Sequence, residues 1–178
     1  MALTLIFFGS FGAWSRFARL QFLGIRNAIS KKDDSAIKKY LDEHGDPNGK
    51  FDSAFGNRKS NTSLLHHSIN ESNLYSCEIL LAYGADPNIT DFRGRTPLML
   101  LFDKNPPAKL KSKFLAMLLP VTNLEAVDEN RKNVLHHAAE YGSKVDYKNI
   151  TEMRPSLSYE KDSLGQLPSD IFGKRFSN

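Results

Sequence analysis

Apolar residues recur along this chain three and four positions apart, which is the spacing of one face of an α-helix. Over residues 15–30, Phe17, Leu20 and Leu23 fall on one side and the arginines mostly on the other, so an amphipathic helix is predicted there. A second helix is predicted over residues 34–43, where a glycine and a proline soon follow and end it. The pattern therefore predicts short helices separated by turns.

Two later stretches, residues 73–81 and 112–119, show the same helical spacing. The connection before the second stretch has several extra residues, two of them adjacent prolines. Residues 148–159 lack a pair of adjacent leucines and contain Pro155, which cannot continue a helix. We therefore expect the helix in that last region to be short or irregular.

A polar phrase recurs between the predicted helices. It reads Asp-Phe-Arg-Gly-Arg-Thr-Pro-Leu over residues 91–98, and degenerate copies of it begin at residues 58, 128 and 162. The intervals between successive copies are 33, 37 and 34 residues. The copies at 58 and 128 continue into His66-His67 and His136-His137. A period of about 33 residues with a Thr-Pro-Leu-His core resembles the ankyrin repeat.

The resemblance implies an all-α solenoid in which each helix–turn–helix unit covers the apolar face of the next. Met99 in place of the motif histidine and Asn133-Val134 in place of Thr-Pro depart from the family pattern. Asp170 stands where the last histidine would be and is expected to give the end of the array a polar surface. We expect about four repeats over residues 15–57, 58–90, 91–127 and 128–161, closed by a C-terminal cap over residues 162–178.

The beginning of the chain, residues 1–14, is either an apolar leader or a segment that packs over the first repeat. It is too short for a stable membrane span, which takes about 20 residues. Its length suits the apolar region of a secretory signal, but no cation precedes it, and Arg16 and Arg19 follow at once. The protein would be periplasmic or secreted with such a signal and cytoplasmic without it.

The charge balance is mildly basic, with 24 Lys and Arg against 20 Asp and Glu and a net charge of +4. Nucleic-acid binding requires basic residues gathered on one face. Here they are scattered, as at Lys38-Lys39, residues 111–113 and Lys174-Arg175, and each group is expected to be a solvated surface. We therefore expect no nucleic-acid partner.

The paired histidines suggest a metal site, but two repeats separate the pairs, whereas zinc needs all its ligands about 2 Å away. In the family that the chain resembles, the residues matching His66 and His136 bond the backbone of a neighbouring turn. His67 and His137 stand where that family keeps an apolar residue. They could form a pH-sensitive spot, because histidine titrates near neutrality. A His-dependent metal-binding protein or enzyme is the alternative of another class.

Other catalytic signals are missing from the sequence. It has no phosphate-binding glycine loop and no Gly-x-Ser-x-Gly elbow. The single cysteine, Cys77, shares a predicted helical face with leucines and is expected to be a small buried hydrophobe. We expect no catalytic residues, no cofactor and no metal.

The resemblance places partner contacts at the turn tips and on the inner helices, which together make a concave surface. Arginine and aromatic side chains dominate binding hot spots, so the tip residues Phe92 and Arg95 are expected to weaken binding, and not folding, when removed. The alternative is that Phe92 only covers the neighbouring turn. The candidate contact residues are Phe51 and Phe55 on the long first loop, Phe92, Arg93 and Arg95, Glu129, Asn130 and Lys132, and Glu140 and Tyr141.

The expected function is therefore non-catalytic protein binding, by a monomer or within a heterocomplex. One concrete role is an inhibitor or self-protection protein that occludes a partner enzyme, with Phe51 and Phe55 entering the cleft of that enzyme. The other is an adaptor or secreted effector that recruits a host or cellular protein.

Overall fold

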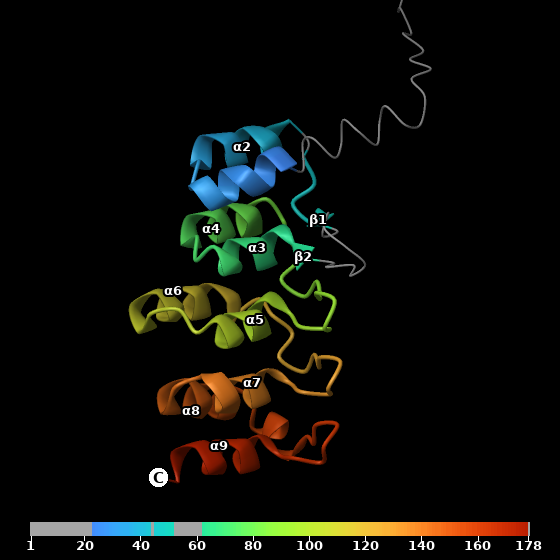
Figure 1. Cartoon of the computed structure of the whole chain (residues 1–178), viewed down its shortest axis with the longest axis vertical. Helices are drawn as coiled ribbons and strands as arrows, with labels where there is room; N and C mark the ends of the chain where they lie inside the picture. The colour runs from blue at the N-terminus through green and yellow to red at the C-terminus, as the bar shows by residue number, and fades with distance from the viewer. Residues whose placement is uncertain (1–22, 44, 52–61, 178) are drawn as a thin grey trace, which may run out of the picture.

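Helical hairpins follow one another in a single column, with extended turns projecting to one side (Figure 1). This computed structural model describes residues 23–43, 45–51 and 62–177. The first hairpin pairs a helical segment over residues 23–31 with α2 (Asp34–Asp42). The later hairpins are α3 (Leu64–Asn70) with α4 (Leu74–Ala82), α5 (Pro97–Lys104) with α6 (Ala108–Leu118), and α7 (Val134–Tyr141) with α8 (Lys144–Met153).

The C-terminal end of the column is a half unit. A 3-10 helix, η1 (Pro155–Tyr159), follows α8 and leads through a turn into α9 (Pro168–Phe176). Tyr147 of α8 stacks on Phe172 of α9, with ring centroids 4.2 Å apart. This aromatic contact joins the last helix to the preceding hairpin.

Two layers of helices run along the column. The inner helices α3, α5, α7 and α9 pack on one another in succession, and α2, α4 and α6 do the same on the other side. Leucine and isoleucine side chains fill the space between the layers, as at the fully buried Leu65, Leu98 and Leu135. The predicted all-α ankyrin-type solenoid is confirmed.

Each inner helix begins at a polar residue that caps it. The side chains of Ser63 and Thr96 accept hydrogen bonds from backbone N–H groups in the first turns of α3 and α5. Asn133 does the same for α7, so the lost Thr-Pro is replaced by another capping residue. These caps fix where each helix starts relative to the turn before it.

The turns before α5, α7 and α9 share one hydrogen-bond pattern. The N–H of Asp91 donates to the carbonyl of Arg95 over 2.9 Å, and the equivalent bonds join Asp128 to Lys132 and Asp162 to Gln166. Neighbouring tips are also joined, because the N–H of Glu129 donates to the carbonyl of Arg93 over 2.8 Å. The tips therefore form a continuous edge along the inner helices.

A short β-hairpin lies beside α3. Its strands, β1 (Lys50–Phe51) and β2 (Thr62–Ser63), pair antiparallel, with Lys50 opposite Ser63. Because this pairing closes the base of the long first loop, both ends of the loop are held at the edge of the inner helices. Residues 52–61, with the candidate contact residue Phe55, lie outside the described residues, as do the predicted leader and residues 15–22 of the first predicted helix, whose residues 23–30 are helical as expected.

The prediction for residues 148–159 holds for their second half, where the 3-10 helix η1 begins at Pro155, and was wrong for their first half. The second helix of that repeat is α8, a regular ten-residue helix that ends at Met153, before Pro155. It starts earlier than expected because Ser143 and Asp146 form a capping box. Likewise α6 starts at Ala108, directly after the two prolines, and not at residue 112.

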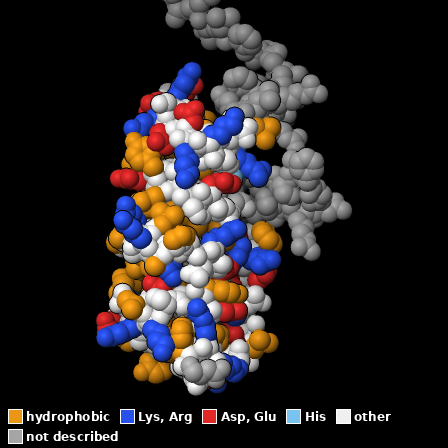
Figure 2. All heavy atoms as spheres, turned by 60° about the vertical axis from the view of Figure 1, so that its left-hand side comes forward, with side chains coloured by type: hydrophobic (Ala, Val, Ile, Leu, Met, Phe, Trp, Pro, Cys, Tyr) orange, Lys and Arg blue, Asp and Glu red, His pale blue; other side chains and the backbone are white. Residues whose placement is uncertain are grey.

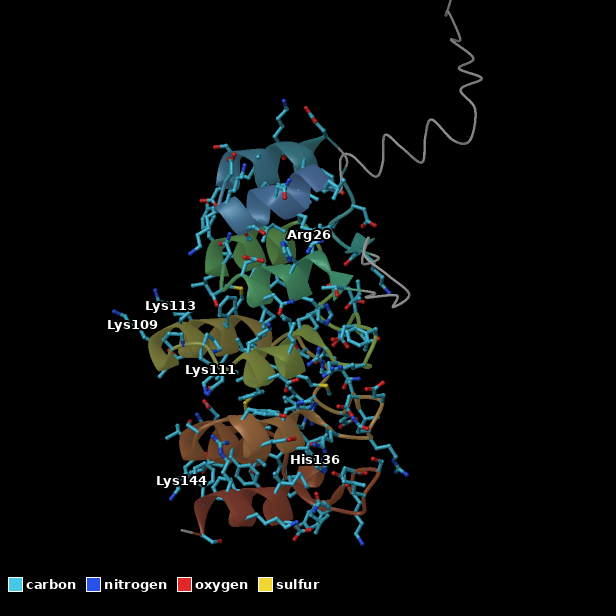
Figure 3. All side chains as sticks on the ribbon, viewed as in Figure 1. Arg26, Lys109, Lys111, Lys113, His136 and Lys144 are labelled. Carbon is cyan, nitrogen blue, oxygen red and sulfur yellow. The ribbon has the colours of Figure 1, made fainter. Side chains whose placement is uncertain are left out.

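The expectation that residues 111–113 form a solvated surface was wrong for Lys111. Its side chain is 7% exposed and pairs with Asp146 of α8 over 2.8 Å. Figure 3 shows Lys111 between α6 and α8, while Lys109 and Lys113 point away from the column. One lysine thus joins two outer helices, and its neighbours face solvent.

Candidate partner-binding surface

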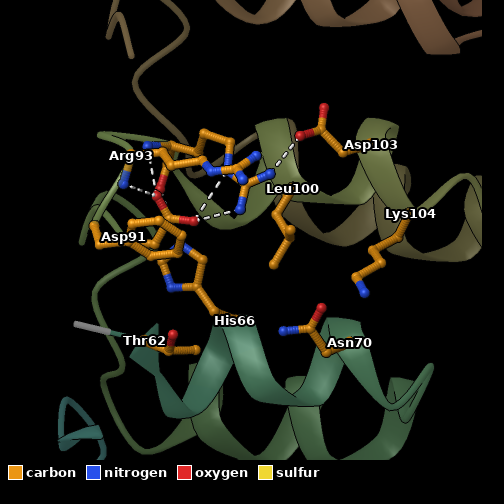
Figure 4. A pocket seen from close by; sticks show the side chains of 10 residues that line it. Thr62, His66, Asn70, Asp91, Arg93, Leu100, Asp103 and Lys104 are labelled. Carbon is orange, nitrogen blue, oxygen red and sulfur yellow. Dashed lines mark hydrogen bonds and ion pairs between the residues drawn. The ribbon is translucent and has the colours of Figure 1, made fainter. Parts of the chain in front are cut away.

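A groove of about 300 Å³ opens between the inner helices α3 and α5 (Figure 4). Thr62, at the base of the first loop, and Asn70 line it from one side. Phe92 and Arg93 line it from the turn tip, and Lys104 lines it from the end of α5. We call the surface formed by the turn tips and by α3, α5, α7 and α9 the groove face.

Two exposed residues at the tip of the turn form one contact unit. Phe92 is 45% exposed, and the guanidinium of Arg93 lies over its ring, 5.3 Å from the centroid. The structure thus leaves Phe92 open to solvent at the groove margin. A stacked Arg–Phe pair presents an apolar surface and a positive charge together, the combination common in binding hot spots.

Arg95 has an internal role in this groove. Its guanidinium lies 2.7 Å from Asp91 Oδ2 and 2.5 Å from Asp103 Oδ2, with only 13% of the side chain exposed. It therefore ties the turn to α5. The expectation that Arg95 could be removed without loss of stability conflicts with these contacts, and its contribution to binding remains a prediction.

His137 connects the α5 and α7 units through two carboxylates. Its Nδ1 lies 2.7 Å from Asp103 Oδ1, and its Nε2 lies 3.2 Å from Asp128 Oδ2. Only a doubly protonated imidazolium can donate to both. Burial opposes the charged form, but these hydrogen bonds outweigh it and raise the pKa of His137. The same bonds lower the pKa values of Asp103 and Asp128 against the effect of burial.

The other paired histidines bond backbone carbonyls. His66 Nε2 lies 2.9 Å from the carbonyl oxygen of Arg95, and His136 Nε2 lies 3.2 Å from that of Gln166, as the family resemblance implied. His67 Nε2 lies 3.2 Å from the carbonyl oxygen of Arg26. Burial lowers the pKa values of these three histidines.

The candidate contact residues of the fourth repeat lie along the same face. Glu129 and Asn130 are exposed at the tip. Lys132 Nζ lies 2.6 Å from Glu140 Oε2, and the hydroxyl of Tyr141 donates to Glu140 Oε1 over 3.0 Å. Burial, together with Glu140, raises the pKa of Tyr141 to about 12. The structure therefore brings these residues together beside α7.

The two candidate residues of the first loop are only partly placed. The backbone of Phe51 belongs to β1, opposite Thr62, which itself lines the groove of Figure 4. Phe55 lies outside the described residues. Their contact with a partner remains a prediction.

A second groove, of about 290 Å³, lies further along the groove face and was not predicted from the sequence. It is lined by Lys132 and Glu140 and by Gln166, Ile171, Lys174 and Arg175 of the C-terminal half unit. The repeat register could have found it, because Gln166 stands where Arg95 and Lys132 stand in the preceding units. Lys174-Arg175 was instead interpreted as a scattered basic pair.

The face brought forward in Figure 2 carries lysines and arginines interspersed with acidic, apolar and neutral side chains. No continuous basic stripe is visible on it. This distribution agrees with the prediction of scattered cations.

Other candidate chemistry is weak in the part of the chain that the structure describes. Within it, no three His, Cys, Asp or Glu side chains are grouped as a metal site would require. Cys77 is fully buried, and burial raises the pKa of its thiol to about 12, so it packs as the expected small hydrophobe. Nor is any described helix long and apolar enough to cross a bilayer.

Comparison with protein families finds a match to the ankyrin repeat over residues 60–92, the stretch that contains α3 and α4. No curated protein matches the chain. The match identifies residues 60–92 as an ankyrin repeat, and the same turn and helix pairing stacked after it supports an ankyrin-repeat array. The chain is thus a protein–protein interaction module, and repeats of this family are typically non-catalytic.

Proposed function

We propose that the protein is an inhibitor or self-protection protein that binds a partner enzyme through its groove face and its long first loop, and occludes that enzyme. The observation that carries the proposal is the groove between α3 and α5, which has a stacked Arg–Phe pair at its margin and the base of the loop beside it. Both features would meet the same partner.

The charges in this groove favour an acidic partner surface. Arg95 and Asp103 neutralise one another, and Asp91 also pairs with Arg95. By contrast, Arg93 and Lys104 form no ion pair with any described residue. Two unpaired cations on one groove attract carboxylates and steer association.

The loop supports the occlusion part of the proposal. Its two ends are held by the β1–β2 pairing, and the N–H of Leu64 donates to the carbonyl of Gly49 over 3.2 Å. A loop anchored at both ends loses less entropy on binding than a free tail. We propose that Phe51 and Phe55 enter the active cleft of the enzyme from this anchored loop.

Affinity capture from the native cell tests the binding face. The wild type is compared with Arg93→Glu/Lys104→Glu on the groove face and with Lys109→Glu/Lys113→Glu on α6, where both lysines are exposed. We expect a captured protein that the groove-face variant loses and the α6 variant retains. Equal retention by both variants would contradict use of the groove face.

An activity assay of the captured protein tests inhibition. We expect its enzymatic activity to fall when purified wild-type chain is added, and Phe55→Ala to weaken that inhibition without changing the melting temperature. A captured protein whose activity does not change would instead favour the adaptor or effector role. Activity of the purified chain that depends on added zinc would favour the metal-dependent alternative.

A further inference from the structure

Two positions repeat along the groove face, and in the α5 and α7 units the side chains at these positions contact each other. One is the turn residue two places before an inner helix, and the other is the seventh residue of that helix. The turn residue is Thr62, Arg95, Lys132 or Gln166, and the helix residue is Asn70, Asp103, Glu140 or Lys174 in the same order.

In the two middle units, these positions carry opposite charges that pair. Arg95 reaches Asp103 over 2.5 Å, and Lys132 reaches Glu140 over 2.6 Å. The unit of α3 has two neutral residues at the same positions. Up to α7, therefore, the row of facing pairs is neutral overall.

The α9 unit breaks the pattern. Gln166 is neutral, and Lys174 has no acidic residue opposite it and no ion pair with any described residue. Both residues line the second groove, next to Ile171. Its other cation, Arg175, is already engaged, because it donates to the carbonyl of Ala139 over 3.2 Å and lies over the ring of Phe176.

We infer that the second groove binds an Asp or Glu side chain of the protein partner, which supplies at Lys174 the carboxylate that Asp103 and Glu140 supply in the middle units. The amide of Gln166 can donate to the same carboxylate, and Ile171 gives an apolar contact for the stem of the acidic side chain. The inference rests on the proposed use of the groove face, and it adds the chemistry and place of one contact.

The composition of the groove favours a protein carboxylate over a nucleic-acid phosphate backbone. Nucleic acids are held by several cations in a row. Here Lys132 is paired with Glu140, and Arg175 is engaged with the Ala139 carbonyl. Lys174 is thus the one lysine of the groove without an ion pair to a described residue, and a single cation does not match a row of phosphates. A single Asp or Glu side chain, with its carboxylate at Lys174 and its apolar stem against Ile171, matches this groove.

An NMR titration of the isotope-labelled chain with short capped peptides tests the inference without knowing the partner. The probe is the tripeptide Glu-Leu-Glu, and Gln-Leu-Gln is the control. We expect the amide signals of Gln166, Ile171 and Lys174 to shift with the acidic peptide only, with an affinity in the millimolar range and weaker in high salt. Equal shifts with both peptides, or none, would overturn the inference.

Two variants separate the unpaired charge from the fold. Lys174→Glu should lower the peptide affinity about fivefold or more. Gln166→Lys/Lys174→Glu copies the Lys132–Glu140 pair, so it should fold with an unchanged melting temperature and still lose the peptide. Lys174→Arg should keep the affinity. A double variant that binds as well as the wild type would overturn the inference.

The peptide titration and the test of the proposed function can fail separately, because they report on different grooves. Retention of the partner by Arg93→Glu/Lys104→Glu bears on the first groove, whereas the peptide titration reports on the second groove alone. A short oligonucleotide serves as a third probe, and a larger shift at Lys174 with it than with Glu-Leu-Glu would show that phosphate, not carboxylate, is the ligand.

Discussion

The α5 unit and the α7 unit have the same turn and the same inner helix but differ in the residues that hold them. The α5 helix begins after Thr96 with Pro97, and its fourth residue is Leu100. The α7 helix begins after Asn133, and its fourth residue is His137. Leu100 is buried among apolar side chains, whereas His137 bonds two carboxylates.

The difference places a buried charge network at one boundary between repeats. Asp91, Arg95 and Asp103 of the α5 unit connect through His137 to Asp128 of the next unit. A repeat array is stabilised mainly by contacts between neighbours. At this boundary, part of that contact depends on protonation and geometry in addition to apolar burial.

Replacing His137 by Leu, which copies Leu100 into the α7 unit, should have the largest effect. The change leaves the Asp103 and Asp128 carboxylates without their shared counter-charge, and breaking a buried pair in this way costs about 3 kcal/mol. Urea unfolding followed by circular dichroism measures it. If the unfolding free energy of His137→Leu stayed within about 1 kcal/mol of the wild-type value, instead of falling by the expected ~3 kcal/mol, the role of the network would be contradicted.

His67→Leu is the matched control. His67 stands at the same helix position in α3 but bonds the Arg26 carbonyl and the Ser30 hydroxyl, not two carboxylates. Losing such neutral hydrogen bonds costs about 1 kcal/mol. A cost as large as that of His137→Leu would mean that any polar residue at this position matters equally.

The next effect comes from the two facing pairs. Arg95 bonds Asp91 and Asp103 together and is 13% exposed, whereas Lys132 bonds Glu140 alone and is 20% exposed. Arg95→Ala should therefore cost about 2 kcal/mol and Lys132→Ala no more than about 1 kcal/mol. Thermal and urea unfolding of the two variants check the order, and a larger cost for Lys132→Ala would reverse this interpretation.

The sequence was sufficient for much of this comparison. Repetition of the phrase at residues 91–98 gave the turn register, and the family resemblance implied that His66 and His136 bond the backbone of neighbouring turns, where the structure has them. The groove-face row follows from the same register. Such features depend on local spacing, which a single sequence displays.

Contacts between units were harder to predict. The pairing of His137 with Asp103 joins residues 34 positions apart, and nothing in the pattern says which rotamers meet. Lys111 is buried for the same reason, because its partner Asp146 comes from the next hairpin. The start of α8 was different, since the Ser143–Asp146 capping box could have been recognised in the sequence.

The pH dependence of stability should distinguish the two units. Because the folded-state pKa of His137 is raised, its stabilisation is complete below the ordinary value of 6.5 and is lost as pH rises through the folded value. The pKa values of Asp103 and Asp128 are lowered in the folded protein, so the same stabilisation is also lost when pH falls below 3.8 and through their folded-state values. The wild type's advantage over His137→Leu should therefore shrink above neutral pH.

Urea titrations of both proteins across this pH range measure that difference. His66, His67 and His136 have lowered pKa values and act in the opposite direction, but they are common to both proteins and cancel. A difference that stayed constant from neutral to alkaline pH would show that His137 is not charged in the folded protein.

The smallest expected effect comes from the turn tips. The α5 and α9 turns have glycine at the position of positive φ, with Gly94 at 76° and Gly165 at 75°, but the α7 turn has Arg131 at 58°. A left-handed backbone costs a residue with a Cβ about 1 kcal/mol or more, although glycine also loses more entropy on folding. Arg131→Gly should therefore stabilise the protein by a few tenths to about 1 kcal/mol.

Arg131→Ala separates backbone strain from loss of the exposed arginine side chain, because alanine keeps the Cβ. It should not stabilise the protein. Gly94→Ala is the reverse change at the equivalent position of the α5 turn. The added Cβ would lie 2.9 Å from the Glu129 nitrogen of the next tip, so it would strain both turns. If Arg131→Gly and Arg131→Ala raised the urea midpoint equally, the gain would come from removing a charge, and the two tips would differ in electrostatics alone.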